Sequence, residues 1–191
     1  ELRELTLSHA KKCNDDILIQ PCLRNHPDIE RLTGRSLATI RIVTCRRQEK
    51  PSIILSTLRC PNRASYVDNF AQGGLAAPIC VETGQIAGPA CQKRLTSGIQ
   101  WHNLHTESQI PFRDFAIPHW RDVQQLVLNA HMHWFDRLPS AGWDIAVLAN
   151  GPSLIEVNPI WAAAPIQISN QKGLLDTLFK DHILEEWAID E

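Results

Sequence analysis

Residues 142–159, GWDIAVLANGPSLIEVNP, specify the most informative element of this chain. Two apolar runs flank an Asn-Gly-Pro turn, and Asn-Gly between apolar runs is a strong signal for a β-hairpin. With the turn at Asn150, Asp144 faces Glu156 across the hairpin, and Asn158 lies two residues further along the same face. The sequence therefore predicts a hairpin with three oxygen-bearing side chains on one face.

This arrangement has a direct chemical consequence. Directly opposed residues of a hairpin have Cβ atoms about 5 Å apart. Two carboxylates at that separation repel by about 3 kcal/mol at an effective dielectric near 20, so they either share a proton or hold a cation. Two carboxylates and an amide carbonyl suit Mg²⁺ or Mn²⁺. The alternative is a solvated hairpin face with scattered polar residues.

Composition narrows the class of protein. The chain has 191 residues and a net charge of −2, so it can bury a core but has no electrostatic footprint for nucleic acid. No apolar run reaches the length of a membrane span, and no signal peptide is visible. The six cysteines form no Cys-x-x-Cys pair. We expect reduced thiols in a cytoplasmic protein that binds neither nucleic acid nor membrane.

The remaining elements indicate one α+β domain in which helices pack against antiparallel strands. Alternating or apolar runs predict strands at 15–20, 38–44 and 52–58, and a hairpin from 77–81 and 85–90. Helices are expected at 28–32, at 120–136 and, after a small-residue linker, at 173–187. The His-rich stretch 99–117 has no regular pattern. In the strand at 38–44, Arg41 lies on the face opposite to Ile40 and Ile42.

The order of motifs along the chain adds a family resemblance. Besides the hairpin, the motifs are Asn25-His26-Pro27, Thr39-Ile40-Arg41-Ile42-Val43-Thr44, Val67-Asp68-Asn69 followed by Gly73-Gly74, His105, Ile117-Pro118 and Trp120. Together they resemble the sugar-transfer-associated ATP-grasp family, which is also described as related to alpha-L-glutamate ligases. The resemblance runs from about Asp16 to Trp161.

The resemblance implies an ATP-dependent carboxylate–amine or carboxylate–thiol ligase with an ATP-grasp fold. ATP then lies between two α+β subdomains, and Mg²⁺ bridges its phosphates to Asp144, Glu156 and Asn158. A small-molecule or peptide carboxylate attacks the γ-phosphate to give an acyl phosphate, which an amine or thiol acceptor opens. Exchange of Asp144 or Glu156 for its amide is expected to abolish turnover with little loss of folding.

Further site residues follow from the same resemblance. Arg41 is expected to face the phosphates or the acyl phosphate, although an exposed strand face or a structural ion pair would also explain it. Asn69 and the Gly73-Gly74 turn correspond to a segment that faces nucleotide or substrate, or the glycines form an ordinary tight turn. Gln20 ends the strand that would be the adenine hinge, or it is simply a strand end.

One family feature has no counterpart here. ATP-grasp enzymes carry a lysine on an earlier strand that contacts the phosphates, whereas Lys11 and Lys12 lie in a polar segment. We therefore expect residues 1–191 to form a single partial ATP-grasp domain, with the hinge and the C-terminal subdomain but without the N-terminal one.

Two other classes of function remain open at this point. The chain could be a non-catalytic ATP-grasp module that binds only nucleotide or a partner. It could also be a zinc hydrolase built from some of its eight histidines. The zinc hypothesis is weak because His131 and His133, two residues apart on a helix, cannot share a metal, and no His-Glu-x-x-His motif occurs.

Overall fold

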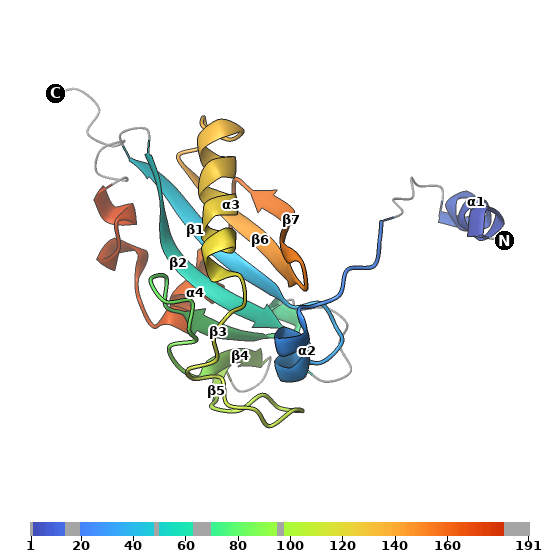
Figure 1. Ribbon diagram of the computed structural model, residues 1–191, viewed down its shortest axis with the longest axis horizontal. Helices are drawn as coiled ribbons and strands as arrows, with labels where there is room; N and C mark the ends of the chain where they lie inside the picture. Colours follow the sequence, from blue (N-terminus) through green and yellow to red (C-terminus); the bar gives the residue numbers. More distant parts are fainter. Residues whose placement is uncertain (1, 14–19, 48–49, 63–69, 95–97, 182–191) are drawn as a thin grey trace.

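The structure is a computed structural model that describes residues 2–13, 20–47, 50–62, 70–94 and 98–181 (Figure 1). Its centre, within these residues, is a seven-stranded antiparallel sheet in the order β5-β4-β3-β2-β1-β6-β7. The strands are β1 (Thr39–Arg47), β2 (Lys50–Cys60), β3 (Leu75–Ile79), β4 (Ala90–Arg94), β5 (Gly98–His102), β6 (Ser140–Leu148) and β7 (Gly151–Asn158). The helices are α1 (Leu2–Cys13), α2 (Pro27–Thr33), α3 (Trp120–His133) and α4 (Ala163–Asn170), with 3-10 turns η1 (Phe70–Gln72) and η2 (Leu174–Asp176).

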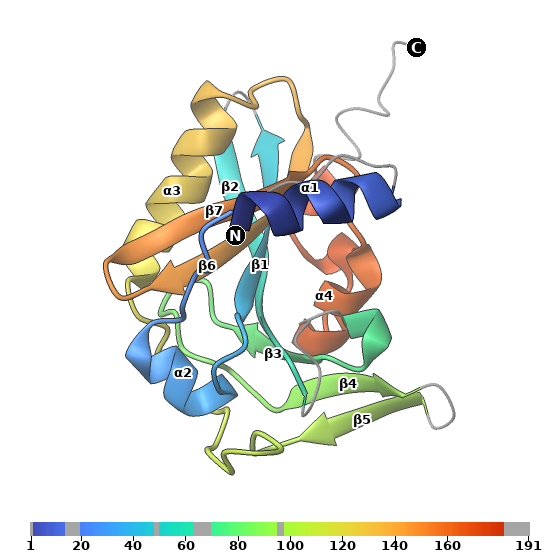
Figure 2. The same cartoon turned by 90° about the vertical axis from the view of Figure 1, so that its right-hand side faces the viewer.

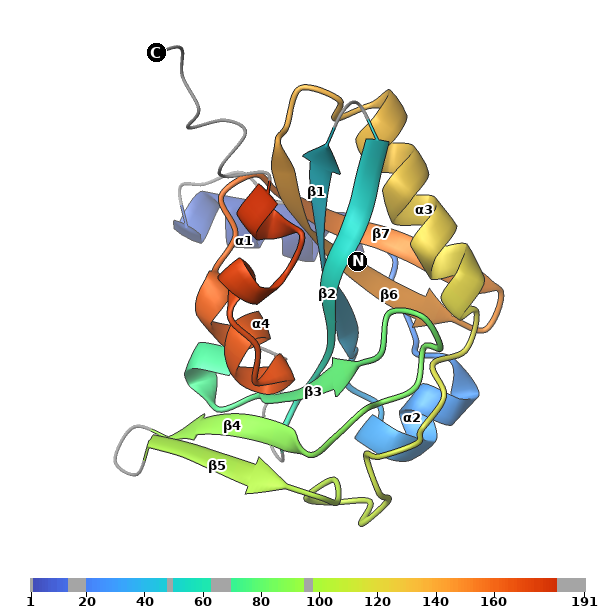
Figure 3. The same cartoon turned by 90° about the vertical axis from the view of Figure 1, so that its left-hand side faces the viewer.

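Helices cover both faces of the sheet. Figures 2 and 3 show α3 and α4 on opposite sides of β1 and β2, while α1 lies apart from the sheet in Figure 1. The alternation of β1 explains this layering. Ile40 and Ile42 join the larger core cluster with α2 and α3, whereas Val43 joins a second cluster with Ile166 of α4. The predicted α+β class with an antiparallel sheet is confirmed.

The predicted hairpin is also confirmed. β6 and β7 are joined by a two-residue turn at Ala149-Asn150, after which Gly151 has a φ of 125° that only glycine adopts readily. Asp144 pairs with Glu156, and a β-bulge follows directly, because Ile145 pairs with Leu154 and leaves Ile155 as the extra residue. The bulge sets the acidic pair at a point where the edge strand β7 bends.

Three elements differ from the sequence-based expectation. In the expected return strand 85–90, Gln85 and Ile86 make only isolated bridges and Ala90 begins β4, which pairs with β3 after the interruption at Gly88-Pro89. Residues 98–102, expected to be irregular, form β5. The predicted linker after Trp161 contains α4, whose Pro165 is tolerated in the first helical turn and whose Ile166 is buried.

The predicted helices also need adjustment. The helix expected at 173–187 begins as the 3-10 turn η2, and Leu175 and Leu178 of its supposed core face are exposed. α3 ends at His133, so Trp134, expected in its apolar stripe, is 72% exposed. The strand expected at 15–20 lies outside the described residues except for Gln20.

A buried polar network connects the end of α3 to the sheet. The His131 Nε2 atom lies 2.8 Å from the carbonyl oxygen of Leu138, which can only accept a hydrogen bond, so Nε2 carries the proton. Nδ1 then accepts from the Thr44 hydroxyl at 2.7 Å, and the Trp143 indole N–H donates to the same hydroxyl oxygen at 2.6 Å. With His131 neutral, every member of this network has a partner, and the Thr44 hydroxyl makes its short bond to Nδ1 rather than the 3.5 Å contact with the Ala141 carbonyl.

We predict that this network makes stability depend on pH. Burial lowers the pKa of His131 below 6.5, the charge of Arg46 acts in the same direction, and the bond to Leu138 opposes them. Between that lowered pKa and about 6.5 the unfolded chain binds a proton that the folded chain does not, so stability falls as the pH falls through this window. Urea unfolding at pH 7.5 and 5.5 measures the loss.

The comparison that isolates His131 is the same pair of measurements on His131→Gln. Its loss of stability on acidification should be smaller than that of the unsubstituted chain. Some loss should remain, because burial also lowers the pKa of His102 and His105. An unchanged pH dependence in His131→Gln would contradict the prediction.

Two further observations concern the environment of the chain. Cys22, Cys80 and Cys91 are free thiols. In the described part of the chain, none of the helices combines the length and the apolar character that crossing a membrane requires.

Candidate functional site

The polar residues of the hairpin belong to a row that crosses four strands. Glu156 of β7 pairs with Asp144 of β6, Asp144 pairs with Arg41 of β1, and Arg41 pairs with Thr57 of β2. Directly paired residues lie on the same face of a sheet, so all four side chains face the α4 side. The row brings together residues that are more than 100 positions apart in the sequence, since Arg41 and Asp144 are separated by 103.

Asp144 is the centre of this row. It is 6% exposed, and its carboxylate accepts two hydrogen bonds from Arg41, from Nε at 2.5 Å and from Nη2 at 2.8 Å. Arg59 of β2 approaches the same carboxylate with Nη1 at 3.3 Å from both oxygens. Such a two-pronged contact is the strongest geometry for an arginine–carboxylate pair. The structural ion pair considered for Arg41 is thus present, and Arg59 is the looser second partner.

Gly142 lies beside this pair, and its lack of a side chain makes room for Trp161. A Cβ atom on Gly142 would lie 2.7 Å from Cβ of Trp161 and 3.7 Å from Cδ of Arg41. Trp161 therefore packs directly over the backbone of β6, and its indole N–H donates to the hydroxyl of Ser140 at 3.2 Å. The Gly-Trp-Asp sequence is explained residue by residue: a glycine under Trp161, a core tryptophan on the opposite face, and the acidic group at the site.

The other two hairpin residues have free coordination capacity. Glu156 is exposed and lies opposite Asp144, and Asn158 follows it on the same strand. The Asn158 Nδ2 atom is buried and has no hydrogen-bond partner within the described part of the chain. A 180° rotation of the amide exchanges nitrogen and oxygen, so Oδ1 can occupy that position, where a cation would satisfy it. The side-chain oxygens of Asp144, Glu156 and Asn158 therefore suit a hard divalent cation. To bind it, Asp144 would give up part of its contact with the arginines.

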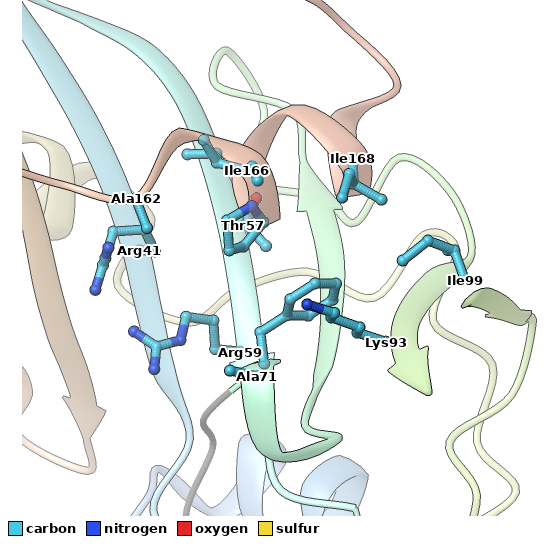
Figure 4. A pocket seen from close by; sticks show the side chains of 12 residues that line it. Arg41, Thr57, Arg59, Ala71, Lys93, Ile99, Ala162, Ile166 and Ile168 are labelled. Atoms are coloured by element: carbon cyan, nitrogen blue, oxygen red, sulfur yellow. The ribbon is translucent and has the colours of Figure 1, made fainter. Parts of the chain in front are cut away.

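A cavity of about 360 Å³ adjoins the row on the side away from β7 (Figure 4). It lies between α4 and strands β2, β4 and β5. Its cationic residues are Arg41, Arg59 and Lys93, and no carboxylate lines it among the residues that the structure describes. Most of its wall is apolar and includes Phe70, Ile99, Ala164, Pro165, Ile166 and Ile168.

The end of α4 is fastened to the wall of this cavity. The hydroxyls of Thr57 and Ser169 lie 2.8 Å apart, and the Asn170 amide donates to the Thr57 hydroxyl at 2.9 Å. The same amide donates to the backbone carbonyl of Ser56 at 3.2 Å. These bonds give the helix a defined position over the cationic residues.

The other predicted site residues lie elsewhere. Gln20 is exposed, and the segment that follows it reaches β6, where the His26 backbone N–H donates to the Val147 carbonyl at 2.7 Å. Gly73 has a φ of +88°, and its carbonyl accepts from the Gln92 side chain at 2.8 Å, while Gly74 is buried. The ordinary tight turn thus accounts for Gly73. Asn69 lies outside the described residues, and the ligand roles of all these residues stay predictions.

Sequence reasoning missed Arg59, Thr57 and Lys93. Thr57 and Arg59 follow one another at the period-two spacing of β2, and that alternation is visible in the sequence. Their place beside Arg41 is not, because it depends on the pairing of Thr39 with Arg59 and of Arg41 with Thr57. Lys93 shares this face because Cys91 of the same strand pairs with Ala76, which in turn pairs with Arg59.

The histidines do not build a zinc centre among the residues that the structure describes, where no group of three His, Cys, Asp or Glu side chains could hold a metal. His102 lies 3.1 Å from the Gln92 side-chain oxygen, and His131 is part of the buried network. His133 is exposed at the end of α3.

An antiparallel sheet with helices on both faces, and an Asp…Glu-x-Asn hairpin beside a cavity that two arginines help to line, are the features expected of an ATP-grasp type of domain. The chain matches the family model described as sugar-transfer associated ATP-grasp over residues 4–181 and belongs to that family. No curated protein matches the chain significantly.

Proposed function

We propose that the chain supplies the metal-binding site of an ATP- and Mg²⁺-dependent carboxylate–amine or carboxylate–thiol ligase. The observation that carries this proposal is the row Glu156–Asp144–Arg41, in a member of the ATP-grasp family. Two carboxylates beside an amide with an unpartnered atom, among the described residues, provide oxygen ligands for Mg²⁺. Bound Mg²⁺ would neutralise phosphate charge, and Mn²⁺ could take its place.

The residues of the row have distinct tasks in this proposal. Asp144, Glu156 and Asn158 hold the cation, and Asp144 is oriented by Arg41. Arg41 and Arg59 face the transferring phosphoryl group, where fixed cations stabilise the charge that develops. A substrate carboxylate oxygen attacks the γ-phosphorus and the bond to ADP breaks. An amine or thiol then attacks the acyl phosphate, loses a proton and expels phosphate.

The proposed roles of Gln20, Asn69, Gly73 and Gly74 rest on the resemblance alone. Gln20 would lie at the adenine hinge, and the segment after it is bonded to β6 at Val147. Asn69 and the glycine turn would approach nucleotide or substrate. The free thiols of Cys22, Cys80 and Cys91 support a proposed location in the cytoplasm.

Glu156→Gln tests the cation site with little risk to the fold. Glu156 is exposed, so we expect its free energy of unfolding to change by no more than about 0.5 kcal/mol. The affinity for the β,γ-imido analogue of ATP should fall at least about tenfold in the presence of Mg²⁺, because the cation loses a charged ligand. Isothermal titration calorimetry with and without Mg²⁺ measures both affinities.

Glu107→Gln is the matched control, because Glu107 is also exposed but lies in the irregular segment between β5 and α3. It should bind the analogue like the unsubstituted chain. We expect the unsubstituted chain itself to bind weakly and only with Mg²⁺. Tight binding of the analogue without metal would overturn the proposed function and would favour a module that binds nucleotide without chemistry.

A further inference from the structure

The cavity under α4 is chemically unlike the hairpin side of the row. Three of its described lining residues are cations, and none is an acid. Arg41 and Arg59 both contact the carboxylate of Asp144, and Lys93 adds a third cation to the lining. Lys93 is exposed on its strand, and its side chain turns toward the cavity (Figure 4). A cavity with this charge attracts an anion.

The apolar walls limit the kind of molecule that can carry the anionic group. Ile166 is 1% exposed and Phe70 is 6% exposed, and Ile168 and Ile99 extend the same wall. The ammonium group of an amino acid would find cations there and, on the described wall, no carboxylate to pair with, which makes its transfer from water costly. An aliphatic or aryl chain gains free energy on the same walls.

The cavity lies apart from the two places proposed above for the nucleotide, the hinge after Gln20 and the metal-binding hairpin. The segment after Gln20 is bonded to β6 at Val147, and Glu156 and Asn158 lie on β7, beyond Asp144 as seen from the cavity. Arg41 stands between the two regions. A phosphate at the hairpin and a carboxylate in the cavity would therefore meet at Arg41.

We infer that this cavity binds the carboxylate substrate, and that this substrate is an acid with an apolar body rather than an amino acid or a sugar acid. This inference rests on the proposed function for its role in catalysis. The anionic head lies at Arg59 and Lys93, and the chain extends along Ile166 and Ile168.

The first test uses binding alone, without nucleotide. Butanoate, hexanoate and octanoate are titrated into the chain by calorimetry, with L-glutamate as the amino-acid probe and hexanamide as the uncharged one. Affinity should rise about fourfold for each methylene buried. Hexanamide and L-glutamate should each bind at least about tenfold more weakly than hexanoate, because one lacks the charge and the other adds an ammonium.

Two pairs of variants locate the binding. Lys93→Met should weaken hexanoate severalfold and leave hexanamide unchanged, whereas Arg94→Met, next along β4 and outside the cavity lining, should change neither. Ala164→Leu should fill part of the cavity and weaken octanoate most. Ala163→Leu, a neighbour on α4 that does not line the cavity, is its control. Thermal melting confirms that each variant is folded.

The results distinguish this inference from the proposed function. If the chain binds the ATP analogue but binds L-glutamate as tightly as hexanoate, the inference is overturned and the proposed function stands. Binding of hexanoate with no binding of the ATP analogue would support the preference of the cavity for apolar acids but contradict the ligase. Displacement of hexanoate by adenosine would assign the cavity to the nucleotide and overturn the inference.

Discussion

Asp144→Asn is expected to lower the free energy of unfolding by about 3 kcal/mol. The substitution leaves Arg41 and Arg59, each 16% exposed in its side chain, without their shared counter-charge. Removing one partner of a buried ion pair is costly because the other charge stays desolvated. Urea unfolding followed by circular dichroism measures the change. The structure thus revises the expectation, drawn from the sequence, that Asp144 could be exchanged with little loss of folding.

Two further variants test whether the loss of stability comes from breaking the ion pair or from the removal of any carboxylate charge. Asp136→Asn removes an exposed carboxylate in the loop after α3 and should change stability by no more than about 0.5 kcal/mol. The double variant Arg41→Met, Asp144→Leu replaces the pair by apolar groups and should be less destabilised than the sum of its single variants. If Asp144→Asn unfolds like the unsubstituted chain, the arginine contacts contribute nothing to stability.

Trp143→Ala is expected to cost about 4 kcal/mol, the range for deleting a large buried aromatic side chain. Trp143 is fully buried behind the acidic row, and its ring packs edge-on against Phe135 at a centroid distance of 5.5 Å. It also donates a hydrogen bond to Thr44 at 2.6 Å. Its loss leaves a cavity between β6 and α3. Urea unfolding monitored by circular dichroism avoids the change in fluorescence.

Trp143→Phe separates packing from hydrogen bonding. It keeps most of the ring but loses the N–H, so a cost of about 1 to 2 kcal/mol is expected. Trp134→Ala is the matched control, because Trp134 is 72% exposed beyond the end of α3. A comparable loss of stability at Trp134 would show that the cost does not come from burial.

Elements that are specified by residues close together in the sequence could be predicted, whereas elements that depend on contacts between distant residues could not. β1 and the β6–β7 hairpin are predictable because period-two alternation and a local turn signal specify them, and α2 is predictable because Gly34 ends it. α4 escapes prediction because only the packing of Ile166 and the Thr57–Ser169–Asn170 bonds reveal it. The helix predicted at 173–187 is wrong at its start, where η2 is a 3-10 turn and Leu175 and Leu178 are exposed, and its residues 182–187 lie outside the described part of the chain.

The acidic hairpin is encoded locally. The turn signal and the two apolar runs predict a hairpin that brings Asp144 close to Glu156. The two-residue turn at Ala149-Asn150 would by itself oppose Asp144 to Ile155, and the bulge at Ile155 is what places Glu156 opposite Asp144. The surroundings of that pair depend instead on long-range packing. Arg41, Arg59 and Lys93 reach the site through pairings among five strands, and the register of strands so distant in sequence is set by packing of the whole sheet rather than by any local turn.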